Sequence, residues 1–351
     1  MVSPMKCFKL FALAAVLGFC ALVLPVGSEA AVEVKMSYNG PADEENNAVH
    51  LFASNFKRLV EEGTGGEVII ELFPDSQLGN EEERMELLLK QGMNLPIMNV
   101  ASFAGVAPVF PEIYASAVPF MFDSFKAAHF FFDESQFWND AKEEFHARTG
   151  AYLVEAVEEG GFLAFTNNVR EIRRAEDFEG LKFRGMDEGQ VILYKSFGAS
   201  GTPVPWTELY LALKTSVVDG QMNPAMYIKM GSLQEVQKYL TLANIQYSDQ
   251  FLVINGDLMD SLPEEHRVVV LDAAKKANVL NREAMAIQDQ KDIDFLVERG
   301  MIACYPNDEE METFRSAGQP AYVEWLKETV GEDWLEKSLQ CARRANEKAK
   351  E

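Results

Sequence analysis

The sequence contains few cysteines and few histidines, which limits the chemistry that the protein can perform. Its 351 residues include four of each. No Cys-x-x-Cys pair occurs, and His50, His129, His146 and His266 are not spaced as metal-binding pairs. A structural zinc site, a redox dithiol and a histidine metal site are therefore unsupported. We expect no metal and no other cofactor.

Catalytic sequence patterns and positive charge are also scarce. The chain has no Gly-x-Ser-x-Gly, no P-loop and no Gly-x-Gly-x-x-Gly after a predicted strand. An enzyme, the competing class, would need one of these or another catalytic set. Lysine and arginine number 32 against 55 aspartates and glutamates, giving a net charge of −23. That charge argues against nucleic acids and anionic lipid surfaces as partners.

The first 30 residues have the pattern of a secretory signal peptide. Lys6 and Lys9 precede the apolar run "LFALAAVLGFCALVLPVG", and small residues follow in "SEAA". This order predicts cleavage after Ala30 and a periplasmic mature chain. An uncleaved membrane anchor is the alternative, because the run is about as long as a short spanning helix. Lipidation at Cys20 is not expected, because Phe19 stands where a small residue would be needed.

Cleavage would leave Cys304 and Cys341 as the cysteines of the mature chain. Exported proteins meet an oxidising compartment, so a disulfide between them is one possibility. Two buried thiols are the other. The sequence does not say whether the two Cα atoms come close enough to be bridged.

The mature sequence alternates between strand and helix patterns. The runs "VEVKMSY", "EVIIELF" and "LPIMNVA" predict strands, with helices between them at 44–62 and 81–91. This β-α-β-α-β order predicts a mostly parallel sheet with helices on its faces. The pattern restarts with the strands "TGAYLVEAVE" and "GLKFRG" and a helix at 190–197. A long helical tract follows at 263–298, and the chain is again helical from Glu309 onward.

These patterns predict an α/β protein of two lobes with mixed, mostly parallel sheets and a long helix that spans both lobes. We place lobe I at 31–160 plus 249–288 and lobe II at 161–248 plus 289–351. Such folds bind small ligands in a cleft at the carboxyl ends of their strands. Arg184 ends the predicted strand "GLKFRG", so it is placed where a ligand contact is expected.

Several motifs resemble one family of transport proteins. They are "PDSQLGNEEERMELLLKQG", "GLKFRG", "GAS-x-TPVPW-x-ELY-x-AL", "T-x-VVDGQ-x-NP" and "EVQKYL", in that order. Together they resemble the solute-binding proteins of TRAP (tripartite ATP-independent periplasmic) transporters. The resemblance runs from about residue 33 to residue 340. Several motifs in the right order and spacing are far more specific than any one of them.

The resemblance implies a ligand with a carboxylate and two residues that hold it. The family arginine that pairs with this carboxylate matches Arg184, and guanidinium offers paired N–H donors to both oxygens. Without the resemblance, Arg184 would be read as a surface arginine paired with Asp187. The family asparagine that bonds the same carboxylate matches Asn223, whose alternative is an ordinary Asn-Pro turn with Pro224.

Five further positions match residues that line the family's cleft. Trp206 stands where the family has a large side chain facing the ligand, and its alternative is plain core burial. Asn39 and Gln77 match positions of the other lobe. Ser102 and Phe103, after the third strand, are weaker candidates of the same kind.

One departure from the family bears on the ligand. Relatives often carry a second arginine in a "G-x-R-x-x-T-N" element, but this chain reads "GGFLAFTNN", with Leu163 at that position. Arg170 falls seven residues later. Without the second cation, another buried carboxylate would be unpaired and costly. We therefore expect a ligand with one carboxylate and a large apolar or aromatic body, such as an aromatic amino acid or an aromatic oxo acid. An ammonium group on it would need an acidic partner such as Glu158, Asp187 or Asp249.

The resemblance also implies how the protein works and with what. The two lobes close over the ligand, and the closed form docks on a membrane permease of a small and a large subunit. An ion gradient drives transport, and this chain, expected to be a monomer, catalyses nothing. The alternatives are a TRAP protein for C4-dicarboxylates or sugar acids, and a ligand-binding subunit of a periplasmic sensor.

Overall fold

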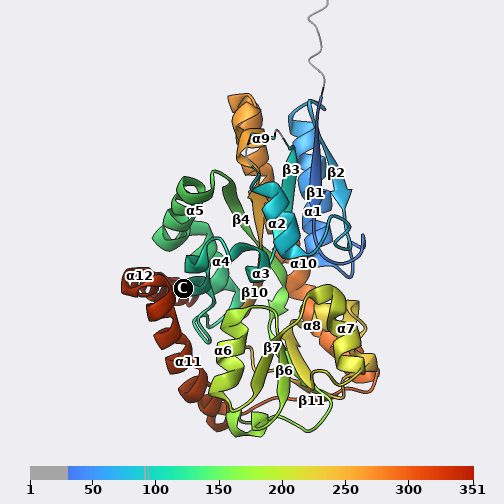
Figure 1. Cartoon of the computed structure of the whole chain (residues 1–351), viewed down its shortest axis with the longest axis vertical. Helices are drawn as coiled ribbons and strands as arrows, with labels where there is room; N and C mark the ends of the chain where they lie inside the picture. The colour runs from blue at the N-terminus through green and yellow to red at the C-terminus, as the bar shows by residue number, and fades with distance from the viewer. Residues whose placement is uncertain (1–30, 91, 94) are drawn as a thin grey trace, which may run out of the picture. The chain divides into compact units, whose positions relative to one another are not determined.

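The computed structural model describes residues 31–351 apart from Gln91 and Asn94. The predicted signal peptide lies outside these residues. Within them, no helix combines the length and the apolar character needed to cross a membrane. Two β-sheets organise this part of the chain, with helices on their faces (Figure 1).

The first sheet comes mainly from the N-terminal half and has the strand order β2-β1-β3-β10-β4. Strand β1 is parallel to β2 and β3, whereas β10 is antiparallel to β3 and β4. The strands are β1 (Val32–Ser37), β2 (Val68–Phe73), β3 (Ile97–Ala101), β4 (Tyr152–Phe162) and β10 (Tyr247–Ile254). The helices in this part of the sequence are α1 (Ala48–Gly63), α2 (Glu81–Leu88), α3 (Phe103–Val106), the 3-10 helix η1 (Pro111–Ala117), α4 (Phe125–Glu134), α5 (Gln136–Thr149) and α9 (Gly256–Ser261).

The second sheet has the order β11-β9-β5-β8-β6-β7 and is also mixed. Strand β5 is antiparallel to β8 and β9, and the remaining pairs are parallel. The strands are β5 (Ala164–Asn167), β6 (Lys182–Gly185), β7 (Ser200–Pro203), β8 (Gly220–Asn223), β9 (Tyr239–Thr241) and β11 (Ile302–Cys304). Its helices are η2 (Ala175–Phe178), α6 (Glu188–Ser196), α7 (Trp206–Lys214), α8 (Ala225–Met230) and η3 (Leu233–Glu235).

Helix α1 shows how local chemistry sets an element. Its apolar residues Phe52, Phe56 and Val60 recur every four positions, so one face is buried against the first sheet. The predicted helix began at Glu44, four residues too early. The Asn47 side chain accepts a hydrogen bond from Val49 N and caps the helix at that point. The preceding residues form a turn instead, in which the Asp43 carboxylate accepts two backbone N–H groups.

The two sheets are joined at three places. Leu163 alone joins β4 to β5, and residues 242–246 join β9 to β10. These two crossings touch, because Leu163 N donates to Gln246 O at 2.9 Å. The third is α10 (Glu264–Glu298), 35 residues long, which packs on α1 and β4 and also on α8. The predicted long helix is confirmed, while the predicted lobe boundaries stay a prediction.

Two C-terminal helices complete the fold, as the sequence predicted in outline. Helix α11 (Asp308–Val330) packs on α6 and η1, and α12 (Glu332–Ala349) packs on α4 and α5. Cys304 in β11 and Cys341 in α12 are both buried free thiols. The disulfide that the sequence left open is therefore not formed.

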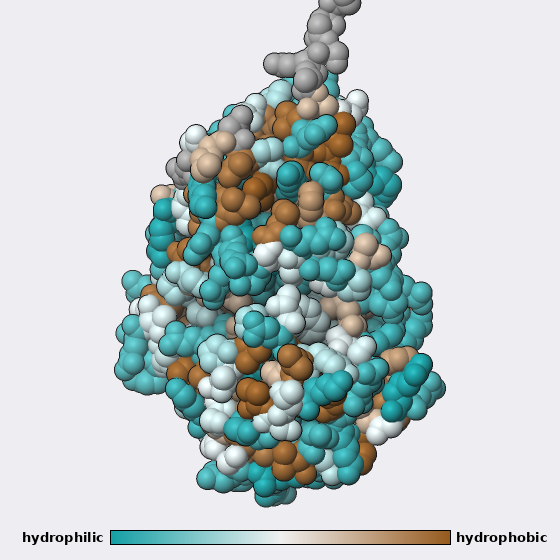
Figure 2. Space-filling view, turned by 45° about the vertical axis from the view of Figure 1, so that its right-hand side comes forward, coloured by the Kyte–Doolittle hydropathy of each residue, from teal (hydrophilic) through white to brown (hydrophobic). Residues whose placement is uncertain are grey.

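The surface is mixed in polarity. On the face shown in Figure 2, hydrophobic residues gather in patches above and below a band of hydrophilic and intermediate residues. The described residues of this face therefore carry no continuous apolar surface.

Candidate functional site

A small, partly open cavity lies beside the two strand crossings, with walls from both sheets. Its volume is about 20 Å³, roughly the space of one water molecule. Wider hollows of about 220 and 600 Å³ share Met186 with it. The cavity is lined by Phe103, Tyr114, Ala117, Glu159, Leu163, Met186, Asp187, Gln190, Asn223, Gln246, Tyr247, Ser248, Asp249 and Tyr322.

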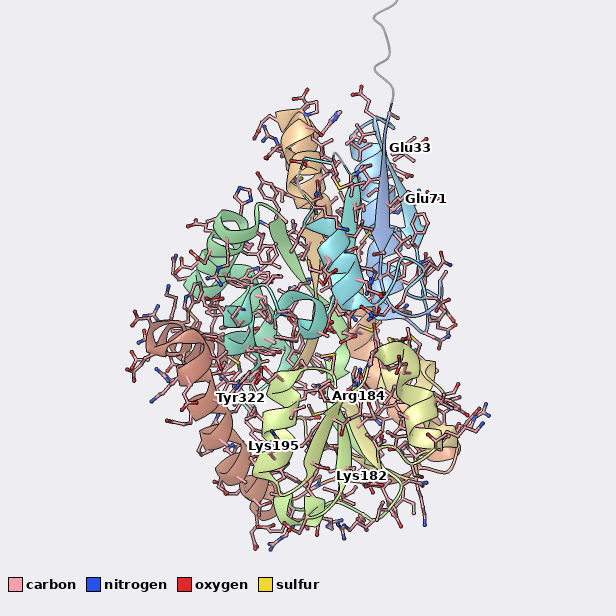
Figure 3. All side chains as sticks on the ribbon, viewed as in Figure 1. Glu33, Glu71, Lys182, Arg184, Lys195 and Tyr322 are labelled. Carbon is pink, nitrogen blue, oxygen red and sulfur yellow. The ribbon has the colours of Figure 1, made fainter. Side chains whose placement is uncertain are left out.

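Arg184 is buried at the end of β6 that faces the first sheet, with Lys182 at the opposite end of the strand (Figure 3). Its Nε donates to Val204 O at 2.8 Å. Its Nη1 has no hydrogen-bond partner among the described residues. Burial lowers the pKa of the guanidinium, and the charges of Tyr194, Glu81, Asp187 and Glu159 oppose this. The arginine thus presents an unsatisfied donor in an acidic neighbourhood.

Asn223 ends β8, lines the cavity and is 6% exposed. A chain of buried side chains holds it in place. Its Nδ2 donates to Gln221 Oε1, whose amide donates to Thr166 Oγ1, which donates to Gln237 Oε1. Such a network fixes the direction of the asparagine amide before any ligand arrives.

Three carboxyl groups face the same cavity. Burial raises the pKa of Glu159 to about 7, against hydrogen bonds from Gln250 and Ser248 that lower it. Burial raises the pKa of Asp187 to about 6 although its carboxylate caps α6 and lies near Arg184. Burial and the charge of Glu159 raise the pKa of Asp249 well above its usual value. Low-dielectric surroundings disfavour charge on all three.

The third acid proposed as an ammonium partner, Glu158, is placed differently. It is absent from the cavity lining, and its Oε2 accepts from His129 Nε2 at 2.6 Å and from Tyr247 Oη at 2.7 Å. These contacts leave Asp187 and Asp249 as the expected partners that reach the cavity.

A second buried arginine, Arg84 of α2, lies on the side of the first sheet and was not predicted. Its Nη2 donates to Asn39 Oδ1 at 2.7 Å, and Asn39 also accepts from Ser76 Oγ at 2.9 Å. Nearby, Ser102 donates through N and Oγ to the Glu81 carboxylate at 2.6 and 2.9 Å. Asn39 and Ser102 are thus buried at this strand edge, where the sequence placed them, but both are already engaged by the protein.

The remaining predicted residues divide between cavity, cleft and surface. Phe103 and Leu163 line the cavity. Trp206, half-buried at the start of α7, lines two hollows of about 220 and 280 Å³ and meets the Tyr227 ring edge-on at 5.4 Å. Gln77 is exposed in a turn and is absent from the linings of these cavities. The structure therefore does not bring Gln77 to the others.

Sequence reasoning missed Arg84, Glu159 and the tyrosines of the cavity. Arg84 stands in the run "EEERMELL", where its neighbours suggest a solvated helix face. Glu159 had a usable signal, since two adjacent glutamates in a strand put one on each face. Tyr322 comes from α11, far away in sequence (Figure 3). Only the tertiary fold brings that residue to the site.

Comparisons with known proteins agree with this geometry. Residues 40–329 match the family model of bacterial extracellular solute-binding proteins, family 7. The 2,3-diketo-L-gulonate-binding periplasmic protein YiaO of Escherichia coli K12 is 30% identical over 263 residues, 75% of this chain and 78% of that protein. A TRAP periplasmic solute-binding protein of Polaromonas sp. JS666 with D-erythronate bound is 30% identical, with a TM-score of 0.80, covering 88% of this chain and 98% of that one. The sugar-acid-binding protein of Advenella mimigardefordensis with galactonate is 27% identical, with a TM-score of 0.82, covering 90% and 99%.

The structure has the predicted two-lobe α/β fold of a periplasmic binding protein, with a cavity lined by residues of both sheets. The chain belongs to the bacterial extracellular solute-binding proteins of family 7, the solute-binding proteins of TRAP transporters. The predicted resemblance is thereby confirmed. The family is one of transport proteins rather than of enzymes.

Proposed function

We propose that this chain captures an organic acid with one carboxylate and a large apolar, often aromatic, body. The carboxylate is received by Arg184 and Asn223, and the lobes close around the ligand. The closed protein then delivers it to a TRAP permease made of a small and a large membrane subunit. The protein acts as a monomer in the periplasm, after cleavage of residues 1–30, and performs no catalysis.

The observation that carries this proposal is the partnerless Nη1 of Arg184. That nitrogen is buried and lacks a hydrogen-bond partner among the described residues. A buried donor left unpaired costs about 1–3 kcal/mol, more for a charged group. An anion at this position would satisfy it and also balance its charge. Arg184 itself is absent from the cavity lining, but Asn223, at the end of the paired strand β8, lines the cavity.

The lining supports an apolar, aromatic ligand body. Phe103, Tyr114, Tyr247 and Tyr322 surround the cavity, and Leu163 stands where relatives carry a second arginine. The cavity of about 20 Å³ is too small for an aromatic acid. Binding therefore requires the lobes to move apart and the cavity to widen toward the hollows that share Met186.

The names of relatives supply the competing ligand classes. YiaO is named for 2,3-diketo-L-gulonate, and two similar structures contain D-erythronate and galactonate. Sugar acids carry many hydroxyl groups, for which the cavity also offers polar partners such as Gln190, Gln246 and Ser248. A sugar acid is therefore the competing outcome of the binding test.

The test is calorimetric titration of residues 31–351 with a panel of acids. The panel contains phenylalanine, tryptophan, phenylpyruvate, succinate, gluconate and galactonate. We expect an aromatic monocarboxylate to bind most tightly. Tighter binding of succinate or of a sugar acid would overturn the aromatic ligand while leaving the family intact. Permease partnership is tested separately, by ligand uptake into vesicles that contain the permease encoded beside this chain.

A further inference from the structure

Asp249 is a buried carboxylate that the carboxylate-binding role of Arg184 leaves unused. It is 3% exposed and lines the cavity. Its Oδ2 has no hydrogen-bond partner in the part of the chain that the structure describes. An acid without a partner is costly inside a protein, so something must offset this cost when the site is in use.

No cation among the described residues makes a hydrogen bond to Asp249 Oδ2. Burial and the charges of Glu159 and Glu158 disfavour its ionisation, and Arg282 is the cation that opposes them. Arg282 Nη1 donates to both Asp133 carboxylate oxygens at 2.9 and 2.8 Å, whereas its Nε and Nη2 have no hydrogen-bond partner among the described residues. Asp249 and Glu159 therefore form an acidic pair that faces the cavity.

The two opposite charges share one region. Glu159 acts electrostatically on both Arg184 and Asp249. Its own carboxylate is directed by Ser248 Oγ at 2.8 Å and by the Gln250 amide. The partnerless carboxylate oxygen of Asp249 thus lies at the cavity. The partnerless guanidinium nitrogen of Arg184 is absent from the cavity lining but is near enough for the charge of the same Glu159 to act on it.

We propose that Asp249 and Glu159 form a subsite for a cationic group, so that the ligand is a zwitterionic 2-amino acid rather than an oxo or hydroxy acid. The inference rests on the proposed function, in which Arg184 receives the carboxylate. The ammonium of the amino acid then lies against the acidic pair and offers three donors to it. Each charge of the ligand meets its opposite in the protein, and none is left unpaired in the closed cavity.

An uncharged carboxyl that bonds a ligand hydroxyl is the main alternative use of Asp249. The two uses differ in their proton balance. An ammonium favours the ionised acids, so binding expels protons from the site to the buffer. A hydroxyl leaves the acids protonated, and no proton is expelled.

The titratable and charged groups that determine how many protons binding releases come from several helices and strands. Asp249 faces Glu158 and Glu159 of β4 and Arg282 of α10. Glu159 also faces Glu81 of α2 and Tyr227 of α8. Since the pKa of Glu159 without ligand is about 7, affinity for an amino acid should rise as the pH is raised from 5.5 to 7.5.

The experiment titrates residues 31–351 with three acids that share one side chain: phenylalanine, phenyllactate and phenylpyruvate. We expect phenylalanine to bind about tenfold or more tightly than the other two, as sites built for a polar group discriminate strongly. We also expect proton release with phenylalanine, measured as heats that differ between buffers of different ionisation enthalpy.

Asp249→Asn tests the subsite with little change in shape. It should reduce the preference for phenylalanine over phenyllactate by about tenfold or more. Asp289→Asn is the matched control: Asp289 is a partly buried acid of α10 with a pKa raised by burial to about 6, absent from the cavity lining. It should leave the preference unchanged. Thermal unfolding of both variants checks that each is folded.

The outcomes separate the two proposals. If phenyllactate or phenylpyruvate binds as tightly as phenylalanine, or if Asp249→Asn leaves the preference intact, the cationic subsite is wrong and the proposed function stands. If only sugar acids or dicarboxylates bind, or if no acid of either panel binds, both proposals fall.

Discussion

The two buried arginines of the cleft come from different lobes and are treated differently by the protein. Arg84 reaches Asn39 Oδ1 at 2.7 Å and has two longer contacts, at 3.4 Å, with Ser37 Oγ and Val100 O. Arg184 donates to Val204 O through Nε, while its Nη1 stays unpaired among the described residues. Both are almost fully buried.

We interpret Arg84 as a structural arginine and propose Arg184 as the binding one. The guanidinium of Arg84 links the loop after β1 to β3, so its hydrogen bonds stabilise one lobe. In the proposed function, Nη1 of Arg184 is the donor that receives an anion from outside the chain. Each arginine keeps one buried nitrogen without a partner among the described residues, Nε in Arg84 and Nη1 in Arg184, so the difference lies in the partners that the Nη atoms of Arg84 have.

Removing Arg184 should have the largest effect on binding. Arg184→Ala should lower ligand affinity by about 2–5 kcal/mol, because the ligand carboxylate would be buried without its partner. Titration of the best ligand of the panel measures this. Arg184→Lys is the control that keeps the charge but loses the paired donors. Its ligand affinity should lie between that of the unchanged protein and that of Arg184→Ala. Unchanged ligand affinity in Arg184→Ala would show that Arg184 does not bind the ligand and does not differ from Arg84 in this respect.

Removing Arg84 should instead affect stability. Arg84→Ala should lower the free energy of unfolding by about 1–3 kcal/mol, because Asn39 and the buried Glu81 lose a favourable neighbour. Urea unfolding gives this value. Arg58→Ala is a matched control on α1, since its ion pair with Glu62 is exposed and should contribute less than about 1 kcal/mol. Equal losses in the two variants would contradict the structural role.

The acids beside Arg184 should make stability depend on pH. The folded-state pKa values of Glu159 and Asp187, about 7 and about 6, lie above their ordinary values of 4.5 and 3.8. The folded protein therefore binds more protons than the unfolded chain between these values, and stability falls as the pH rises. Without ligand, the melting temperature should be higher at pH 5.5 than at pH 8. Glu159→Gln should flatten this slope, and an unchanged slope would show that Glu159 is not the group responsible.

Trp206 should have the smallest effect. It lines the hollows beside the cavity, including the one that Asn39 lines on the Arg84 side, but it is absent from the cavity itself. Trp206→Ala should weaken binding by about 0.5–1 kcal/mol, the usual range for residues outside an energetic centre. If Trp206→Ala lost as much affinity as Arg184→Ala, we would infer that the ligand body lies in the hollows and not in the cavity.

Much of the fold followed from periodicity in the sequence. Four of the five strands of the first sheet, all but β10, and the long helix α10 were predicted because apolar spacing and breakers mark them. The helices between Phe103 and Thr149 were not predicted, because their apolar residues serve a shared aromatic core rather than one helix face. The antiparallel pairing of β10 with β3 and β4 was also not predicted. The direction of this strand depends on a crossing between segments that are distant in the sequence.

The site was predictable only where a motif marked it. Arg184 and Asn223 were found through the resemblance, and the structure places both at strand ends of the same lobe. Gln77 was matched to the cleft but lies exposed in a turn. Asp249 was considered only as one of three acids, because burial and lost partners are properties of the tertiary structure. Each of these roles stays a proposal until binding is measured.

Helix α10 has a mechanical consequence. Asn278 and Asn281 donate to Ala156 O and Glu158 O of β4, which fixes the first part of the helix to one sheet. Asp292, farther along, accepts from Lys229 of α8 at 2.7 Å, which fixes the later part to the other side. This continuous helix is thus held at both ends. If the lobes rotate, the helix must bend between Asn281 and Asp292. The free energy needed for this bending opposes further separation of the two lobes.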